Sequence, residues 1–460
     1  MKNIFKKSML TSICACIAII SACSSAPVNQ AATNANTPSE PQIITIKAQA
    51  PVESTRLDAI VAAADQLNAE LKAEGRPEQV KVDASIFTGS WDEYRKQFIL
   101  AFKSKKEPDI YVNGHDELSW LAKGNYILPL NELKDSTAFQ DMYPNLWNSV
   151  TWKGNIWGIP QDTEARPIFY RKDLLKKMGW SDEEIKSLPE KVKNGEFTLD
   201  DMTRVGKEAQ AAGIAKIGVL HRPTSGPDFH MMAMNFGATL YDPNKDQLIF
   251  DKPAILKTLT YLNDLAQVEK VMPASITSME FKNVWTMLKE GNVLFYYGGI
   301  WNVNSLMQNG MTKEEVLDKF GFTLIPAAEK GGQPITLSHP QVYTISSQTK
   351  HKDLAVRLLE LASAPDYQAK HSILTWHFPV TKSGADAKEF KDDPFLSRTN
   401  YMLDYTTYLP NNENFIKYQD IFYKAIQAVE LGKLSPEDAV KNMDSELKTS
   451  FGGDLIIKEN

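Results

Sequence analysis

Carboxylate, guanidinium and indole side chains occur in loop segments of this chain, where they could contact a ligand. The charged candidates are Asp116, Glu164, Arg222 and Asp228. Such groups make charge-assisted hydrogen bonds, which are about twice as strong as neutral ones. Trp301 follows two glycines, and a flat indole offers a large contact area to an apolar ring face. A ligand that presents both hydroxyl groups and apolar C–H faces would use both kinds of contact.

Each charged candidate also has a purely structural interpretation. Asp116 could cap a helix that begins just after it. Glu164 could form an ion pair with Arg166, two residues further on. Arg222 and Asp228 flank a loop containing two prolines and a glycine, and they could pair across it. These alternatives stay open at the level of the sequence.

Other aromatic and histidine side chains could either bind or pack. Trp91 could cap a helix or face a ligand, and Trp376 lies in a Trp-His-Phe run. Phe415 and Tyr418 fall on a predicted C-terminal helix, where core packing is the alternative. His230 and His339 have structural roles as their alternative. Three further tryptophans fit helical or buried patterns and are expected to pack in the core: Trp120, Trp147 and Trp285.

Several functional classes lack support in the sequence. The chain has no Gly-x-Ser-x-Gly, His-Glu-x-x-His or P-loop motif. Only one of its three cysteines, Cys23, lies outside the first 22 residues, so neither a disulfide framework nor a thiolate zinc cluster is expected. A net charge of −6 without a basic stripe argues against nucleic acid as a partner. We expect neither a metal centre nor a cofactor.

The N-terminus reads as an export signal. A lysine-containing start precedes the apolar run 9–20, which is shorter than the roughly 20 residues of a membrane-spanning helix. Residues 20–23 read Ile-Ser-Ala-Cys and resemble a lipobox. We therefore predict a signal peptide over 1–22 and lipidation of Cys23, with an uncleaved anchor as the alternative. The small, polar segment 23–41 is expected to be a flexible tether.

The periodicity after the tether predicts alternating strands and helices. The expected strands are 43–47, 80–86 and 108–112, and the expected helices are 56–74, with Val61 on its apolar face, and 94–102. Two further helices are expected to begin with caps at Thr198 and Ser435, each followed three residues later by an aspartate. This βαβαβ order predicts a parallel sheet flanked by helices. Ligands of such sheets sit beyond the carboxyl ends of the strands. That rule points to the loops 49–51, 88–91 and 113–117.

Motifs along the chain resemble the extracellular solute-binding proteins of ABC importers, in the sugar-binding branch related to maltose-binding protein. They are Pro108-Asp109-Ile110 to His115-Asp116, Gly154 to Pro160 (GNIWGIP), Phe169 to Leu175 (FYRKDLL), Gly291-Asn292-Val293, Gly298-Gly299-Ile300-Trp301, Phe378-Pro379-Val380 and Leu409-Pro410-Asn411. The resemblance implies a type II periplasmic-binding-protein fold. Each of its two α/β lobes would have a mostly parallel sheet, and hinge strands would join them. The lobes would comprise 42–163 with 327–374, and 164–326 with 375–460.

The resemblance also implies a sugar site. Asp116 and Glu164 would contact sugar hydroxyls, the loop from Arg222 to Asp228 would reach into the cleft, and Trp301 would stack on a ring. The maltose binders have an aromatic residue at the position of Asn113 and a basic one at that of Glu117, and the segment 181–196 is longer here. The substrate-binding candidates are Trp91, Asn113, Asp116, Glu117, Glu164, Arg222, Asp228, Trp301, His339, Trp376, Phe415 and Tyr418.

The implied function is capture of a mono- or oligosaccharide by a monomer tethered to the outer face of the cell membrane, and its delivery to an ABC permease. Three alternatives stay open. Tyr296-Tyr297 resembles the tyrosine pair of ferric-ion receptors, although adjacent strand residues point to opposite faces. A lipid-anchored glycoside hydrolase would need two carboxyl groups about 5–10 Å apart. An adhesive surface lipoprotein would expose aromatic side chains without a closing cleft.

Overall fold

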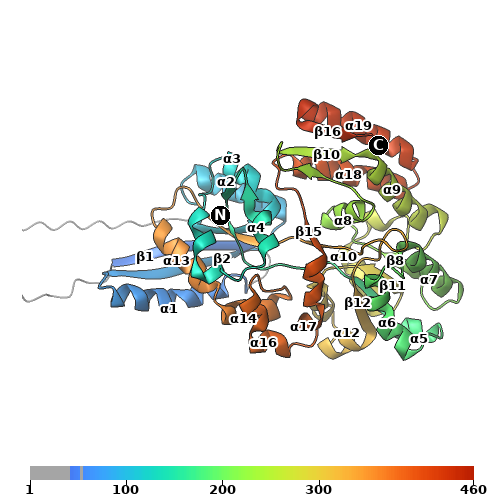
Figure 1. Ribbon diagram of the computed structural model, residues 1–460, viewed down its shortest axis with the longest axis horizontal. Helices are drawn as coiled ribbons and strands as arrows, with labels where there is room; N and C mark the ends of the chain where they lie inside the picture. Colours follow the sequence, from blue (N-terminus) through green and yellow to red (C-terminus); the bar gives the residue numbers. More distant parts are fainter. Residues whose placement is uncertain (1–41, 52–54, 460) are drawn as a thin grey trace, which may run out of the picture. The chain divides into compact units, whose positions relative to one another are not determined.

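The computed structural model describes residues 42–51 and 55–459. The predicted signal peptide, the lipidation site Cys23 and the tether 23–41 lie outside the described residues. Within 42–459 the chain builds two separate α/β sheets, each covered by helices (Figure 1). We call these the first and second lobes and define them by their sheets. The residue boundaries of the two lobes that the resemblance implies stay a prediction. Among the described residues, no helix has the length and apolar character needed to cross a membrane.

The first lobe contains the predicted βαβαβ unit. Its sheet has the strand order β2 (Glu78–Phe87), β1 (Gln42–Pro51), β3 (Ile110–Gly114), β14 (Gln341–Ile345), β6 (Ile159–Pro160). β1 pairs in parallel with both β2 and β3, which confirms that part of the prediction. The helices of this lobe are α1 (Asp58–Ala73), α2 (Trp91–Lys103), α3 (Leu118–Lys123), α4 (Pro144–Val150) and α13 (Lys352–Ala362).

Helix α1 illustrates how the sequence pattern produces the packing. Ile60, Leu67 and Leu71 are buried at helical spacing, and α1 packs against α13 as well as the sheet. Val61, predicted on the same face, is instead 45% exposed because it lies at the edge of the buried stripe. The chain leaves the helix at Gly75, whose φ of +72° favours glycine.

The second lobe has a mixed sheet with the order β12 (Phe320–Thr323), β7 (Ile168–Arg171), β11 (Val293–Tyr297), β8 (Ile217–Leu220). Only β8 and β11 are parallel, whereas β7 runs antiparallel to both its neighbours. β14 is likewise antiparallel to β3 and β6 in the first lobe. Each sheet therefore contains one reversed strand, β14 or β7, while its other strands share one direction, which agrees with the expected mostly parallel sheets. In both sheets the reversed strand is the first one of that sheet after the chain crosses from the other lobe.

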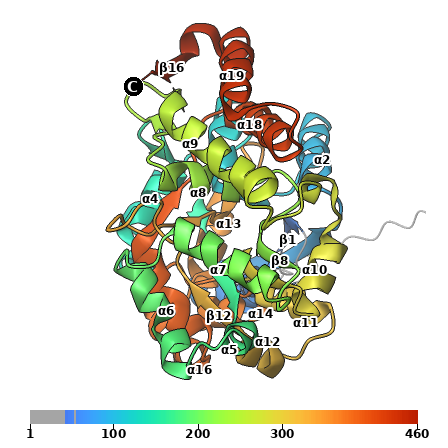
Figure 2. The same cartoon turned by 90° about the vertical axis from the view of Figure 1, so that its right-hand side faces the viewer.

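Helices surround the sheet of the second lobe, as Figure 2 shows from that side. They are α5 (Lys172–Lys177), α6 (Asp182–Lys193), α7 (Leu199–Ala211), α8 (Pro227–Asn235), α9 (Lys252–Asn263), α10 (Phe281–Lys289), α11 (Asn302–Gln308) and α12 (Lys313–Lys319). The long segment 181–196 is thus mostly a helix, α6, which Ser181 and Glu184 begin with a capping box. The predicted cap at Thr198 of α7 is also confirmed.

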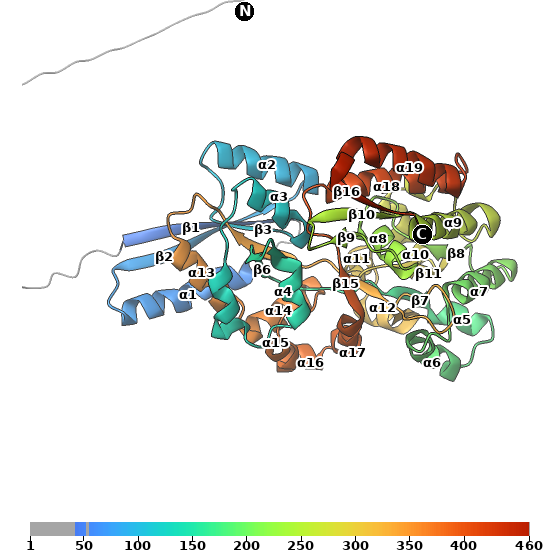
Figure 3. The same ribbon diagram turned by 45° about the horizontal axis from the view of Figure 1, so that its top comes forward.

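The C-terminal part packs on the second lobe. Helices α18 (Phe415–Glu430) and α19 (Pro436–Phe451) lie beside α9 and a small sheet (Figure 3). That sheet has the order β16 (Leu455–Lys458), β10 (Gln247–Asp251), β9 (Tyr241–Asp242). Ser435 caps α19, as predicted.

The chain passes between the lobes several times. Residues 161–167 lead from β6 in the first sheet to β7 in the second, and residues 324–340 lead back from β12 to β14. The return segment contains β13 (Thr336–Ser338), which pairs in parallel with β15 (Thr406–Tyr408). Thr163 forms an antiparallel bridge with Phe378. These adjacent segments hold the candidate site.

The remaining regular elements are short or lie beside these crossings. They are β4 (Thr151–Trp152), β5 (Asn155–Ile156), α14 (Pro365–Thr375), α15 (Lys382–Asp386), α16 (Lys388–Asp392), α17 (Leu396–Thr399), the 3-10 helices η1 (His115–Glu117), η2 (Asn131–Asp135), η3 (Thr137–Phe139), η5 (Ile276–Ser278), η6 (Asn400–Tyr405) and η7 (Gly452–Asp454), and the π-helix η4 (Asp264–Val268).

Candidate functional site

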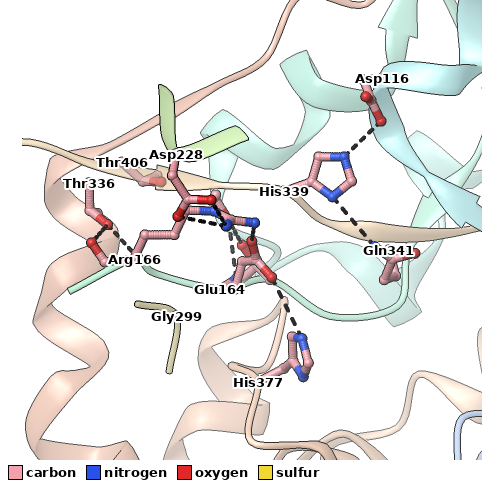
Figure 4. A network of polar contacts seen from close by, with 12 residues as sticks. Asp116, Glu164, Arg166, Asp228, Gly299, Thr336, His339, Gln341, His377 and Thr406 are labelled. Atoms are coloured by element: carbon pink, nitrogen blue, oxygen red, sulfur yellow. Dashed lines mark hydrogen bonds and ion pairs between the residues drawn. The ribbon is translucent and has the colours of Figure 1, made fainter. Parts of the chain in front are cut away.

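Four charged side chains form one network at the crossing from the first to the second lobe (Figure 4). Arg166 donates from Nη2 to Oε1 of Glu164 at 2.6 Å, and from Nη1 to the two carboxylate oxygens of Asp228 at 3.1 and 3.2 Å. Arg222 donates to Oδ2 of Asp228 at 2.9 Å. We call Glu164, Arg166, Arg222 and Asp228 the charged network. Glu164, Arg166 and Asp228 are each no more than 4% exposed.

The charged network keeps the carboxyl groups of Glu164 and Asp228 in their ionised form. Burial alone would raise the pKa values of Glu164 and Asp228, but the adjacent Arg166 guanidinium holds both below their usual range. Both ion pairs considered from the sequence, Glu164 with Arg166 and Arg222 with Asp228, are present. The network can therefore offer fixed charges and hydrogen-bonding groups to a polar ligand.

Strand β13 holds the network in place through the backbone. Ser338 Oγ accepts a hydrogen bond from the backbone N–H of Glu164 at 3.1 Å, and Thr336 Oγ1 accepts one from that of Arg166 at 2.7 Å. The side chains of Thr163 and Ser338 also hydrogen-bond to each other. Two crossing segments far apart in sequence thus fix each other's position.

Trp301 lies against the charged network. Its ring is 4.7 Å from the guanidinium carbon of Arg166 and runs parallel to the His377 ring, with 5.8 Å between ring centroids. His377 Nε2 lies 3.6 Å from Oε2 of Glu164. A Cβ atom at Gly299 would come within 2.0 Å of the indole. The absence of a side chain at Gly299 is therefore what allows the indole to fold back over the backbone.

A cavity of about 220 Å³ opens beside these groups. Its lining combines charged, aromatic and amide groups: Arg166, Arg222, Asp228, Phe281, Trp285, Tyr296, Tyr297, Gly298, Gly299, Trp301, Asn302 and Ser305. On helix α10, Phe281 and Trp285 stack at 5.9 Å between centroids. An apolar wall facing two arginines and a carboxylate suits a ligand with both hydroxyl groups and C–H faces.

A second polar group lies at the carboxyl end of β3. His339 Nε2 lies 2.7 Å from Oδ1 of Asp116 (Figure 4). Asp116 raises the pKa of His339 despite burial, and His339 in turn lowers the pKa of Asp116. The helix-capping interpretation of Asp116 is wrong, since neither η1 nor α3 has a side-chain cap. His115 is fully buried beside this pair, and its ring centroid is 5.0 Å from that of His339.

Other predicted site residues of the first lobe have different surroundings. Asn113 is buried inside the sheet, where its Oδ1 accepts from Thr344 Oγ1 at 3.3 Å. Glu117 is buried against Arg95 at 2.8 Å, and burial raises its pKa to about 7. Trp91 begins α2, is 36% exposed and meets Tyr94 edge-on. None of these side chains lines the cavity described above.

The structure does not bring Trp376, Phe415 or Tyr418 to the cavity either. Trp376 adopts a left-handed backbone conformation (φ +59°) at the end of α14 and is buried against Phe395. Phe415 and Tyr418 lie buried on α18 and pack around His230. Trp376, Phe415 and Tyr418 therefore pack against other buried side chains, which is the alternative considered from the sequence.

Comparison with known proteins shows which family this chain belongs to. Residues 57–369, more than half of the chain, match the model of the bacterial extracellular solute-binding proteins. This chain belongs to that family. The arabinooligosaccharide-binding protein of Bacillus subtilis is 22% identical over 339 residues, which cover 70% of this chain and 73% of that protein.

Solved structures share the fold of this solute-binding protein. MalE, a sugar-binding protein from Xanthomonas citri, superposes with a TM-score of 0.72 at 20% identity, covering 88% of this chain and 97% of that one. Maltose-bound MalE3 of T. maritima gives 0.71 at 19% identity, covering 89% and 100%. The predicted family and two-lobed α/β fold are therefore confirmed.

Sequence reasoning missed part of the cavity of this solute-binding protein. Trp285 was expected to pack in the core, yet it both stacks on Phe281 and lines the cavity. The four-residue spacing of these aromatics on a helix was the available signal. The sequence points to Trp376, but the structure places the neighbouring His377 beside Glu164. The left-handed backbone at Trp376, which determines which of the two side chains reaches Glu164, has no recognisable pattern in the sequence.

The tyrosine pair does not form a ferric site. Tyr297 hydrogen-bonds through its hydroxyl to Tyr261 at 2.9 Å, whereas Tyr296 meets Phe169 and Trp285 edge-on. Burial raises the pKa of both phenols, which disfavours the phenolate that a trivalent ion requires. Although both residues line the cavity, their side chains have different partners, as alternation along β11 predicts.

Proposed function

We propose that this solute-binding protein captures a mono- or oligosaccharide between its lobes and delivers it to the membrane permease of an ABC importer. It would act as a monomer, tethered through lipidated Cys23 to the outer face of the cell membrane. The observation that carries the proposal is one cavity lined both by three members of the charged network, Arg166, Arg222 and Asp228, and by the indole of Trp301. The sugar ligands named for the relatives described above agree with this chemistry.

Electrostatics favour binding over hydrolysis. A glycoside hydrolase needs one carboxylic acid that stays protonated near neutral pH. Asp228, which lines the cavity, and Glu164 beside it instead have lowered pKa values next to Arg166. Glu117, whose pKa burial raises to about 7, is ion-paired with Arg95 and does not line the cavity. An adhesive role also lacks support, since Trp91 is the only strongly exposed aromatic side chain in the part of the chain that the structure describes.

The proposal is tested by a thermal-shift screen of the purified protein against mono- and oligosaccharides, followed by calorimetry on each sugar that raises Tm. A ligand that binds only the folded state stabilises it in a concentration-dependent way. Trp301→Ala should cost about 2–4 kcal/mol of binding free energy, in line with aromatic hot spots. Trp180→Ala, which removes a half-buried indole remote from the cavity lining, is the matched control.

Two results would reject the proposal. If no sugar raises Tm while ferric citrate does so and colours the protein, the receptor binds iron instead. If a sugar binds but Trp301→Ala and Trp180→Ala leave its affinity equally unchanged, the sugar site lies elsewhere.

A further inference from the structure

Beyond sugar capture, we propose that His115, Asp116 and His339 form a binding site for a divalent transition-metal ion such as zinc. One ligand atom from each side chain lies within 4.8 Å of the others. His115 and Asp116 belong to η1 at the end of β3, and His339 lies between β13 and β14. The site would therefore join the first lobe to the segment that returns from the second.

The three ligand types match zinc chemistry. Zinc binds imidazole nitrogens and carboxylate oxygens at about 2.0–2.2 Å with tetrahedral geometry, which requires ligand atoms roughly 3.4 Å apart. His339 Nε2 and Asp116 Oδ1 are already 2.7 Å apart. Small rotations of these side chains would lengthen the distance between His339 Nε2 and Asp116 Oδ1 and bring the His115 ring nitrogen closer to both atoms. The three ligand atoms would then have the spacing of a tetrahedral site.

An unpartnered buried nitrogen supports the site independently. His115 is fully buried, and among the described residues its Nδ1 has no hydrogen-bond partner. Its Nε2 lies 3.3 Å from the backbone oxygen of Leu409. A metal-bound histidine commonly donates its other ring N–H to such a carbonyl. Donation from Nε2 leaves a lone pair on Nδ1 that a metal ion would satisfy.

The surroundings of His339 fit the same role. Gln341 Nε2 lies 3.5 Å from His339 Nδ1, while Gln341 Oε1 is buried without a partner in the described part of the chain. Turning the Gln341 amide over exchanges its oxygen and nitrogen, which are assigned from hydrogen bonding. The oxygen could then accept from Nδ1–H of His339, leaving Nε2 for the metal.

The donor set defines the class of ion. Two imidazoles and one carboxylate suit zinc, cobalt, nickel or copper, whereas calcium and magnesium require mainly oxygen ligands. Three protein ligands leave a fourth position for water or a ligand hydroxyl. The nearby charges oppose each other, since Glu164 raises the pKa of His339 and Arg166 lowers it. The positive charge of Arg166 is therefore offset by a carboxylate near the proposed metal ion.

The test uses tag-free protein that has been dialysed against a chelator. We expect calorimetry to detect one zinc ion per chain, and cobalt to give the visible absorption bands of a tetrahedral complex. Calcium and magnesium should give neither signal. His115→Ala and His339→Ala should each weaken zinc binding by more than about 10-fold, whereas His351→Ala, outside the group, should not. Asp116→Asn provides a further variant if the buried His115 is needed for folding.

The proposal fails if the wild-type protein binds no zinc, or if folded His339→Ala and Asp116→Asn variants bind it with wild-type affinity. This outcome is separable from the sugar proposal. If the wild-type protein binds sugar but no zinc, only the metal site is rejected; if it binds zinc but no sugar, only the sugar receptor is rejected.

Discussion

At the residue scale, Gly299 determines where the proposed stacking indole can lie. A Cβ at this position would approach the Trp301 ring to 2.0 Å, so Gly299→Ala must displace the ring. Because the displaced ring no longer lies under Arg166, we expect sugar affinity to fall about 10-fold, or about 1.4 kcal/mol. Calorimetry checks this result. Gly453→Ala, where a Cβ meets nothing within 4 Å, should leave affinity unchanged, and equal affinities of the two variants would contradict the argument.

His230 is a buried polar group without compensation. It is 1% exposed, and neither ring nitrogen has a hydrogen-bond partner in the described residues. Burial lowers its pKa from 6.5 to about 3. Between pH 6.5 and 3 the unfolded chain therefore binds a proton that the native state excludes, so stability falls as pH falls.

His230→Phe tests that account. The ring packs against Phe415 and Phe422, so an apolar ring fits its surroundings. Removing the two unpaired nitrogens should raise the free energy of unfolding at pH 7 by about 1–3 kcal/mol. It should also reduce the loss of stability between pH 6.5 and 4. Urea unfolding at both pH values measures these effects, and a less stable variant with an unchanged pH slope would refute the explanation.

At the scale of single elements, local patterns predicted much of the fold. The βαβαβ order and both helix caps depend on neighbours in sequence, and all were predicted correctly. The candidate site depends on partners that are far apart: Asp116 pairs with His339, 223 residues away. Periodicity cannot specify such a partner. The direction of β7 depends on which lobe the chain comes from, so the one reversed strand in each sheet could not be predicted from local patterns.

The inserted helix α6 allows a test at this scale. Ser181 Oγ accepts a hydrogen bond from the backbone N–H of Glu184, and the Glu184 carboxylate accepts one from the backbone N–H of Ser181. Losing such a cap costs about 1 kcal/mol, so Ser181→Ala should lower the free energy of unfolding by that amount. Sugar affinity should stay unchanged because α6 contributes no residue to the cavity lining. Denaturant unfolding and calorimetry together check both statements; a lower affinity would show that α6 influences the site.

At the scale of the whole described molecule, one group of contacts between the two halves is made by Asp246, in the turn between β9 and β10. Asp246 Oδ1 accepts from Nε1 of Trp152 at 3.2 Å, and Lys153 lies 3.2 Å from Oδ2. Both partners belong to the β4–β5 hairpin, which packs with the first lobe. Asn412 also donates to Asp246. This turn therefore stabilises the arrangement in which the lobes meet.

Asp246→Ala should weaken sugar binding without touching the sugar, because a ligand that binds between the lobes is held more tightly when the lobes stay together. Apparent affinity scales with the fraction of molecules in the binding-competent state. Losing one charged pair and one hydrogen bond between the lobes, both partly exposed, should cost about 1 kcal/mol of that balance, a roughly 5-fold rise in Kd. Lys245→Ala is the control, because among the described residues its ammonium group pairs with Asp242 of the same turn and not with Asp246. If both variants bind sugar like the wild type, the contacts at Asp246 do not contribute to lobe closure.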